Sequence, residues 1–195
     1  YTWTVVVAGD HQPPAVHALA RAINQALGNV NATVVYTTPV VASPLDGAGS
    51  IADLVADMSA GKVRVLLILG GNPVFTAPAD LGFEAALEKV PFRAHLGLYH
   101  DETAELCQWH APEAHYLESW GDVRAFDGTV SIIQPLIAPL YATRSPHEML
   151  AVFGPTPEKS GYDIVREHWL KATGLGVPGD EDDATPEFEA KWRKW

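Results

Sequence analysis

The sequence predicts an α/β protein with a three-layer, doubly wound, mainly parallel sheet of the Rossmann-like type and an irregular C-terminal appendage. Two observations indicate this class. Apolar, β-branched runs alternate with stretches whose apolar residues recur at helical spacing. Turn residues (Gly, Pro and Asn) separate these runs. Such alternation favours parallel strands joined by right-handed crossovers. We expect the α/β domain over residues 1–153 and a helical or irregular extension over residues 154–195.

The first strand–helix–strand unit lies near the start of the chain. Residues 2–8 are apolar and β-branched, as is typical of a buried strand. Residues 15–27 carry apolar side chains at helical spacing, and Gly28 suits the end of that helix. We expect residues 32–38 to form the second strand, parallel to the first.

The same pattern recurs further along the chain. We expect a short helix over residues 51–60 and a strand over residues 63–69, which is apolar on both faces like a central parallel strand. Residues 80–90 have a helical pattern, and residues 92–99 are expected to form the fourth strand. Asp101 follows this strand and is suited to cap the next helix.

The regular alternation weakens after Trp109. Residues 110–129 are polar and aromatic, and connections of this length are usually functional or disordered. Residues 130–137 are apolar enough for a further strand. Residues 145–153 begin with a capping box, which indicates a helix, and residues 160–173 are expected to form another.

The composition is that of a globular protein and limits the possible functions. The chain has 195 residues, 47% of them hydrophobic, and a formal net charge of −11. An acidic chain is poorly suited to bind nucleic acid or an anionic membrane. No apolar run approaches the ~20 residues that span a bilayer. We therefore expect no nucleic-acid partner and no direct membrane insertion.

The chain contains a single cysteine, Cys107. It has no partner for an internal disulfide, and a four-cysteine iron–sulfur or zinc site cannot form within these residues. The chain starts at Tyr1, and the first expected strand begins almost at once. We expect the sequence to be a piece of a longer polypeptide, although a processed mature protein would look the same.

A glycine-rich turn, Gly70-Gly71-Asn72-Pro73, follows the third expected strand. In open parallel sheets, ligands bind beyond the carboxyl ends of the strands. Glycines let backbone N–H groups approach a ligand, and the amide of Asn72 can both donate and accept hydrogen bonds. A nucleotide-like ligand and an ordinary turn without a ligand are both compatible with this pattern. Parallel topology would place three further turns on the same edge: residues 9–12, 37–39 and 100–103.

The segment over residues 100–121 is rich in possible metal ligands. Their spacing matches no strong zinc signature, so we expect neither a metal site nor a catalytic residue here. The interpretation that we favour is structural: aromatic side chains hold the segment against the sheet, the histidines bond to the backbone, and Cys107 is an inert buried thiol. The possible ligands are His100, Glu102, Cys107, His110, His115 and Glu118.

The order of segments in residues 66–121 resembles the molybdopterin oxidoreductases of the dimethyl sulfoxide reductase type. LLILGGNPVFTAPADLGFEAALEKV is followed by a strand, then by DETA, then by a proline and then by E-x-x-G. Gln108 departs from the pattern, because the family has an aspartate there. The resemblance covers roughly residues 5–153. It implies an α/β domain of the kind that helps to hold a bis-guanine-dinucleotide cofactor.

Residues 107–141 (CQWHAPEAHYLESWGDVRAFDGTVSIIQPLIAPLY) are most similar to one branch of that family, the molybdopterin-like iron–sulfur subunit of bacterial alternative complex III. This branch is thought to lack the molybdenum cofactor and carries its iron–sulfur clusters elsewhere in the polypeptide. The family's cofactor contacts carry over to six residues here, which are Gly70, Gly71, Asn72, Pro73, Glu102 and Thr103.

The resemblance implies a fragment of a respiratory quinol:acceptor oxidoreductase subunit that acts as a scaffold, with no redox centre and no turnover of its own. No cofactor is expected in the fragment, although molybdopterin guanine dinucleotide is possible in the family. The partners would be the rest of the polypeptide and other subunits of a membrane complex. The complex would lie at the periplasmic face of the bacterial inner membrane, and the fragment itself would be soluble. The alternative is a free-standing α/β module that binds a nucleotide or small molecule.

Overall fold

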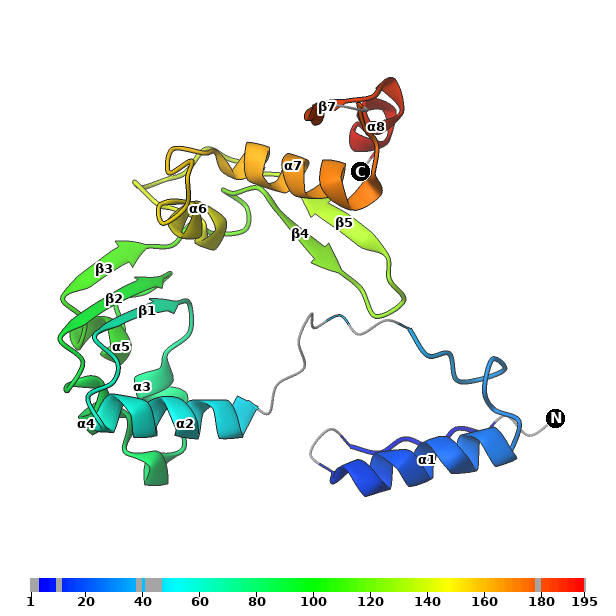
Figure 1. Cartoon of the computed structure of the whole chain (residues 1–195), viewed down its shortest axis with the longest axis horizontal. Helices are drawn as coiled ribbons and strands as arrows, with labels where there is room; N and C mark the ends of the chain where they lie inside the picture. Colours follow the sequence, from blue (N-terminus) through cyan, green and yellow to red (C-terminus); the bar gives the residue numbers. More distant parts are fainter. Residues whose placement is uncertain (1–3, 10–11, 38–39, 41–46, 178–179, 195) are drawn as a thin grey trace. The chain divides into compact units, whose positions relative to one another are not determined.

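The computed structural model describes residues 4–9, 12–37, 40, 47–177 and 180–194 (Figure 1). The chain divides into two compact units. The first comprises Tyr1–Ala42 with Ala125–Thr129, and the second comprises Ser43–Arg124 with Val130–Trp195.

The first unit is built around helix α1 (Pro14–Ala26), which confirms the expected helix. The expected strands over residues 2–8 and 32–38 are wrong where they are described, since this part of the unit has only an isolated bridge between Val30 and Val34. The physical reason lies in the buried side chain of Asn24. Its Nδ2 donates to the Val6 carbonyl at 2.7 Å and its Oδ1 accepts from the Val6 amide at 3.0 Å. A side-chain amide therefore takes the place of a neighbouring strand.

A three-stranded parallel sheet forms the centre of the second unit. Its order is β1 (Val65–Leu69), β2 (Phe92–Gly97) and β3 (Trp109–Pro112). Val65 pairs with Phe92, and Ala94 pairs with Trp109. The parallel direction and the strands expected over residues 63–69 and 92–99 are thus confirmed. β3 lies in the stretch that we expected to be irregular.

Short helices cover one face of this sheet (Figure 1). They are α2 (Gly47–Ser59), α3 (Pro73–Thr76), the 3-10 helix η1 (Ala79–Leu81), α4 (Phe83–Leu87) and α5 (Glu102–Glu105). The helix expected over residues 80–90 is divided at Gly82, whose φ of +61° ends η1 in the left-handed region.

The core under the sheet joins α2, α4 and β1. Met58, Leu87 and Val90 are fully buried there, with Leu66 and Ile68 of β1 packed against them. On the opposite face, Val65 and Trp109 at the starts of their strands are 64% and 67% exposed, whereas Leu96 near the end of β2 is fully buried. A second layer of helices, and with it the Rossmann-like arrangement, is not confirmed in the described part of this unit.

The rest of the second unit is more regular than expected. β4 (Gly121–Arg124) and β5 (Val130–Ile133) form an antiparallel hairpin. α6 (Pro146–Ala151) begins with the expected capping box, formed by Ser145 and Glu148. α7 (Gly161–Thr173), the strands β6 (Gly176–Val177) and β7 (Asp180–Ala184), and α8 (Pro186–Trp192) follow. The domain boundary at residue 153 stays a prediction.

A second core holds this C-terminal part together. Phe188 and Leu170 are buried there beside Val165 of α7, and Trp120 from the segment before β4 packs against them. Trp120 and Trp192 stack with ring centroids 6.2 Å apart. The described C-terminal residues are thus anchored to earlier parts of the chain.

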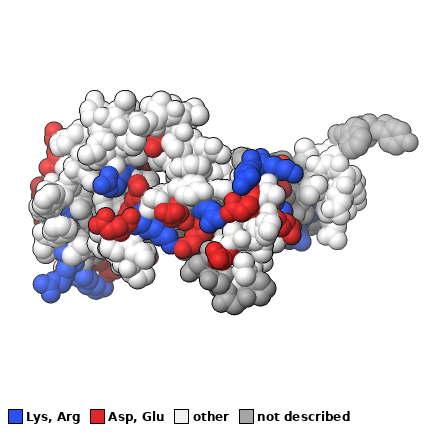
Figure 2. Space-filling model, turned by 90° about the horizontal axis from the view of Figure 1, so that it is seen from above, with Lys and Arg blue, Asp and Glu red and all other residues white. Residues whose placement is uncertain are grey.

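Charges of both signs are interspersed on the surface that Figure 2 displays. Ion pairs among the described residues include Lys62 with Asp57 at 2.8 Å and Arg166 with Glu189. Exposed pairs of this kind contribute about 0–1 kcal/mol each to stability.

Candidate functional site

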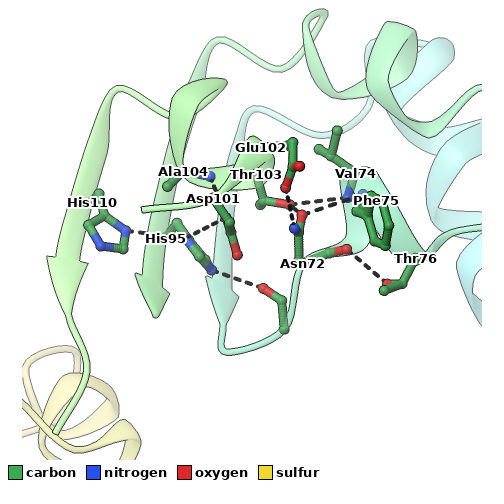
Figure 3. A network of polar contacts seen from close by, with 11 residues as sticks. Asn72, Val74, Phe75, Thr76, His95, Asp101, Glu102, Thr103, Ala104 and His110 are labelled. Carbon is green, nitrogen blue, oxygen red and sulfur yellow. Dashed lines mark hydrogen bonds and ion pairs between the residues drawn. The ribbon is translucent and has the colours of Figure 1, made fainter. Parts of the chain in front are cut away.

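Two turns lie side by side at the carboxyl ends of β1 and β2 (Figure 3). They are residues 70–73 and residues 100–103, as expected from a parallel sheet. The turns expected over residues 9–12 and 37–39 belong to the first unit, and residues 10–11 and 38–39 fall outside the described residues. The structure thus brings all six sequence-predicted contact residues to one edge of the sheet.

Two left-handed glycines make the first turn. Gly70 and Gly71 have φ of +69° and +72°, which strains any residue with a Cβ. The Gly70 amide donates to the Leu96 carbonyl at 2.7 Å, and the Gly71 carbonyl accepts from Nε2 of His95 at 3.1 Å. Both glycines are therefore explained by the path of the backbone.

The side chain of Asn72 joins the two turns through hydrogen bonds to Glu102 and Thr103, and we call this set of contacts the Asn72 clasp. Its Nδ2 donates to Oε2 of Glu102 at 2.6 Å, and its Oδ1 accepts from Oγ1 of Thr103 at 2.7 Å. The same Oδ1 caps α3 by accepting from the Phe75 amide, and the buried Thr103 hydroxyl accepts from the Val74 amide at 3.1 Å. Most of the hydrogen-bonding capacity of Asn72 is consequently used within the chain.

Glu102 keeps a negative charge at this edge. The hydrogen bond from Asn72, followed by one from its own backbone amide, lowers the pKa of the Glu102 carboxyl. Asp101 beside it accepts from the Ala104 amide at 3.0 Å and caps α5. Pro73, the first residue of α3, has no N–H to offer a ligand.

His95, which donates to the Gly71 carbonyl, forms a pair with His110. His95 of β2 is 1% exposed, and its Nδ1 is 3.2 Å from Nδ1 of His110 on β3. Its Nδ1 is also 3.9 Å from Oδ1 of Asp101. Burial, followed by the nearby His95 and His100, lowers the pKa of His110.

The His95 ring requires a glycine two positions further along β2. A Cβ at Gly97 would stand 2.5 Å from Cε1 of the His95 ring. Sequence reasoning missed His95 altogether. The available signals were a histidine inside a predicted strand and a glycine at the next position on the same face.

The other candidate ligands serve the local backbone. Nδ1 of His115 accepts from the Leu117 amide at 3.3 Å, and Glu118 accepts from the Leu140 amide at 3.2 Å. Burial raises the pKa of the Cys107 thiol, which keeps it protonated. Across the described ranges, no three His, Cys, Asp or Glu side chains are arranged to hold a metal ion.

Gln108 stands where the family of the resemblance has an aspartate. Its Oε1 accepts from the Arg93 amide at 2.7 Å at the start of β2. The substituted position is therefore at the opposite end of the strand from the Gly70–Pro73 turn, and it joins the segment before β3 to β2.

The chain was compared with protein-family models, curated proteins and solved structures. No protein-family model matches the chain. A curated relative, the menaquinone reductase molybdopterin-binding-like subunit of Nitratidesulfovibrio vulgaris (strain Hildenborough), is 30% identical over an alignment of 138 positions, which covers 67% of this chain and 20% of the relative. These figures support kinship with molybdopterin oxidoreductases. The chain spans about a fifth of that relative's length.

A solved structure shares the fold. Acetylene hydratase from Pelobacter acetylenicus superimposes with a TM-score of 0.52 and 17% sequence identity, over 67% of this chain and 20% of that one. At that identity the likeness concerns the fold alone. Among the helices of the described segments, none combines the length and the apolar character required to cross a bilayer.

Proposed function

We propose that this chain is part of a molybdopterin oxidoreductase-like subunit of a bacterial quinol:acceptor complex, where it serves as a scaffold derived from a cofactor-binding domain. The similarity to the menaquinone reductase subunit supports the first part of this proposal. The resemblance of residues 107–141 to alternative complex III supports the type of complex. The parent chain would carry its iron–sulfur clusters elsewhere, and the complex would lie at the periplasmic face of the inner membrane.

The Asn72 clasp is the observation that favours a scaffold. A residue that reads a base or ribose needs free donors and acceptors, whereas Asn72 spends one donor and both acceptor positions on Glu102, Thr103 and Phe75. The clasp connects helices whose first residues are 29 positions apart, so its effect is to fix two turns against each other. That is a structural task.

The charges at this edge also disfavour a phosphate ligand. Asp101 and Glu102 are acidic, and a pyrophosphate would be repelled by them. The cation of β2, Arg93, lies at the other end of the strand, where it donates to the carbonyls of Leu106 and Val90, each at 2.6 Å. The net charge of −11 likewise argues against a nucleic-acid partner.

A nucleotide titration tests the scaffold role. The ¹⁵N-labelled chain is titrated with GDP and GTP to millimolar concentration while the backbone amides of residues 70–75 and 101–104 are followed by NMR. We expect no saturable shift. The matched variant Glu102→Gln, which keeps an acceptor for Asn72 but removes the charge, should give the same result. Saturable binding by either protein would favour the free-standing nucleotide-binding module.

Isolation of the native protein tests the complex. The chromosomal gene is tagged, membranes are solubilised, and the tagged protein is purified and analysed by mass spectrometry. We expect iron–sulfur subunits to copurify and the preparation to oxidise a quinol. A tagged protein that elutes alone at the mass of this chain, 21.0 kDa, would contradict the proposal.

A further inference from the structure

The buried pair of His95 and His110 has a fixed arrangement of protons. A carbonyl oxygen only accepts, so Nε2 of His95 must carry the hydrogen that it donates to Gly71. In a neutral His95 ring, Nδ1 is then an acceptor. His110 must therefore donate its Nδ1–H across the 3.2 Å that separates the two Nδ1 atoms.

The pair can take up one proton without losing a hydrogen bond. If the proton goes to Nε2 of His110, the Nδ1–H of His110 still donates to His95. If the hydrogen between the rings moves to Nδ1 of His95, the direction of the bond reverses and the Gly71 bond stays. A second proton leaves two Nδ1–H groups pointing at each other at 3.2 Å, and the rings then have to separate.

The surroundings offer His95 a second acceptor. Oδ1 of Asp101 is 3.9 Å from Nδ1 of His95, within a small movement of a charge-assisted hydrogen bond. His110 belongs to the edge strand β3 and is partly exposed, so its ring has access to solvent. The two rings therefore have a separated arrangement in which each is satisfied.

Some titratable groups around the pair favour its protonation and others oppose it. His100 lies 5.3 Å from His110 between ring centroids and disfavours further positive charge. Asp101 favours it. Glu113 follows β3, and burial raises its pKa while His95 lowers it. Glu102 accepts a hydrogen bond from Asn72, and Arg93 donates to the carbonyl of Leu106.

We propose that the His95–His110 pair is a pH switch between two arrangements of this edge of the sheet. With no proton or one proton added, the rings stay bonded and connect β3 through His95 to the Gly71 carbonyl. With two protons added, the rings separate and His95 donates its Nδ1–H to Asp101, the cap of α5. This inference goes beyond the scaffold role and does not depend on it.

An NMR titration of the full ¹⁵N-labelled chain from pH 8 to pH 4.5 tests the switch. The ring nitrogens of His95 and His110 are followed together. We expect the pair to take up its two protons in two separate steps, because both rings share one hydrogen bond. The amides of Gly71 and Ala104 should shift with that second step.

The variant His110→Asn isolates the pair. Asparagine keeps an N–H donor near the position of Nδ1 but cannot be protonated, so the second step should disappear while the core amides of α4 keep their shifts. His100→Asn, which removes a neighbouring ring but leaves the pair intact, should retain both steps. The wild-type titration decides by itself if the variant fails to fold. A single protonation step shared by His95 and His110, or Ala104 shifts that are the same in His110→Asn, would overturn the proposal.

Discussion

Two parts of the chain carry the same strand–helix–strand pattern and fold differently. Residues 65–97 form two parallel strands with helices packed beneath them. The described residues among 4–37 form a helix, and the apolar segments on either side of it belong to none of the sheets described. The difference lies in what satisfies the backbone. β1 and β2 bond to each other, while the backbone of Val6 bonds to the side chain of Asn24. A β-branched run thus becomes a strand only when a neighbouring strand accepts its hydrogen bonds.

The helices of the two parts differ in the same way. Leu87 of α4 is fully buried, and Leu19 of α1 is 60% exposed, although both belong to the apolar stripe of a helix. Similar hydrophobic patterns in the two helices therefore contribute differently to the free energy of unfolding. Substitutions in each helix measure the difference.

The largest effect is expected from Leu87→Ala. The variant removes buried methyl groups under the sheet and leaves a cavity, so it should lower the free energy of unfolding of the second unit by about 2–5 kcal/mol. Leu19→Ala in α1 is the matched control and should change the free energy of unfolding of the first unit by less than about 0.5 kcal/mol. Urea titration checks both, followed by amide resonances of β1 and β2 for Leu87→Ala and of α1 for Leu19→Ala. Equal effects would mean that the α1 stripe is as well packed as the α4 core.

Asn24→Ala should disorder the segment before α1. The variant leaves the amide and carbonyl of Val6 without their partners, and it removes the acceptor of Nδ2 of the buried Asn29 at 2.9 Å. The cost should be about 1–3 kcal/mol, the range for unsatisfied buried polar groups. Hydrogen exchange at the Val6 amide should accelerate accordingly. The exposed neighbour Gln25→Ala is the control, and unchanged exchange in Asn24→Ala would show that Val6 is held by other contacts.

Thr103→Val should loosen the clasp at the sheet edge. The buried hydroxyl donates to Asn72 and accepts from the Val74 amide, and its removal should cost about 1–2 kcal/mol. Thr76→Val is the control, because that exposed hydroxyl donates to the Asn72 carbonyl and has no part in the Thr103 contacts. Amide exchange at Val74 reports the effect. Equal exchange rates in the two variants would contradict a clasp centred on Thr103.

The smallest effect is a pH dependence of opposite sign at two neighbouring groups. The pKa of His110 is lowered on folding, so the unfolded chain binds more protons and stability falls as the pH drops below about 6.5. The pKa of Glu113 is raised, so the folded chain binds more protons and stability falls as the pH rises above about 4.3. Denaturation midpoints at pH 7 and pH 5.5 should differ less in His110→Asn than in the wild type, and an equal difference would exclude His110.

Much of the second unit could be predicted from sequence because its signals are local. Apolar runs marked β1 and β2, and the Ser145–Glu148 capping box marked α6. β3 could not be predicted, since its four residues include a proline and a histidine and become a strand through pairing with β2. The two N-terminal strands were predicted wrongly for the opposite reason. Their sequence pattern suits a strand, but the backbone of Val6 bonds to the side chain of Asn24 and not to a neighbouring strand.

The sequence predicted where the site lies but not the hydrogen bonds within it. Parallel topology sufficed to bring Gly70–Pro73 beside Glu102 and Thr103. The hydrogen bond from Thr103 to Asn72 could not be predicted. It joins residues 31 positions apart, and no local sequence pattern indicates such a contact. His95 was missed because a single histidine in a strand carries no signal until its partner on the next strand is known.

The bare α-carbon of Gly97 has a consequence for related chains. The imidazole at position 95 occupies the volume that any larger residue at position 97 would need. Position 97 therefore cannot gain a side chain while the ring at position 95 stays in place. Relatives with a side chain at position 97 should carry a small residue in place of the ring, and would then have no histidine pair at this edge.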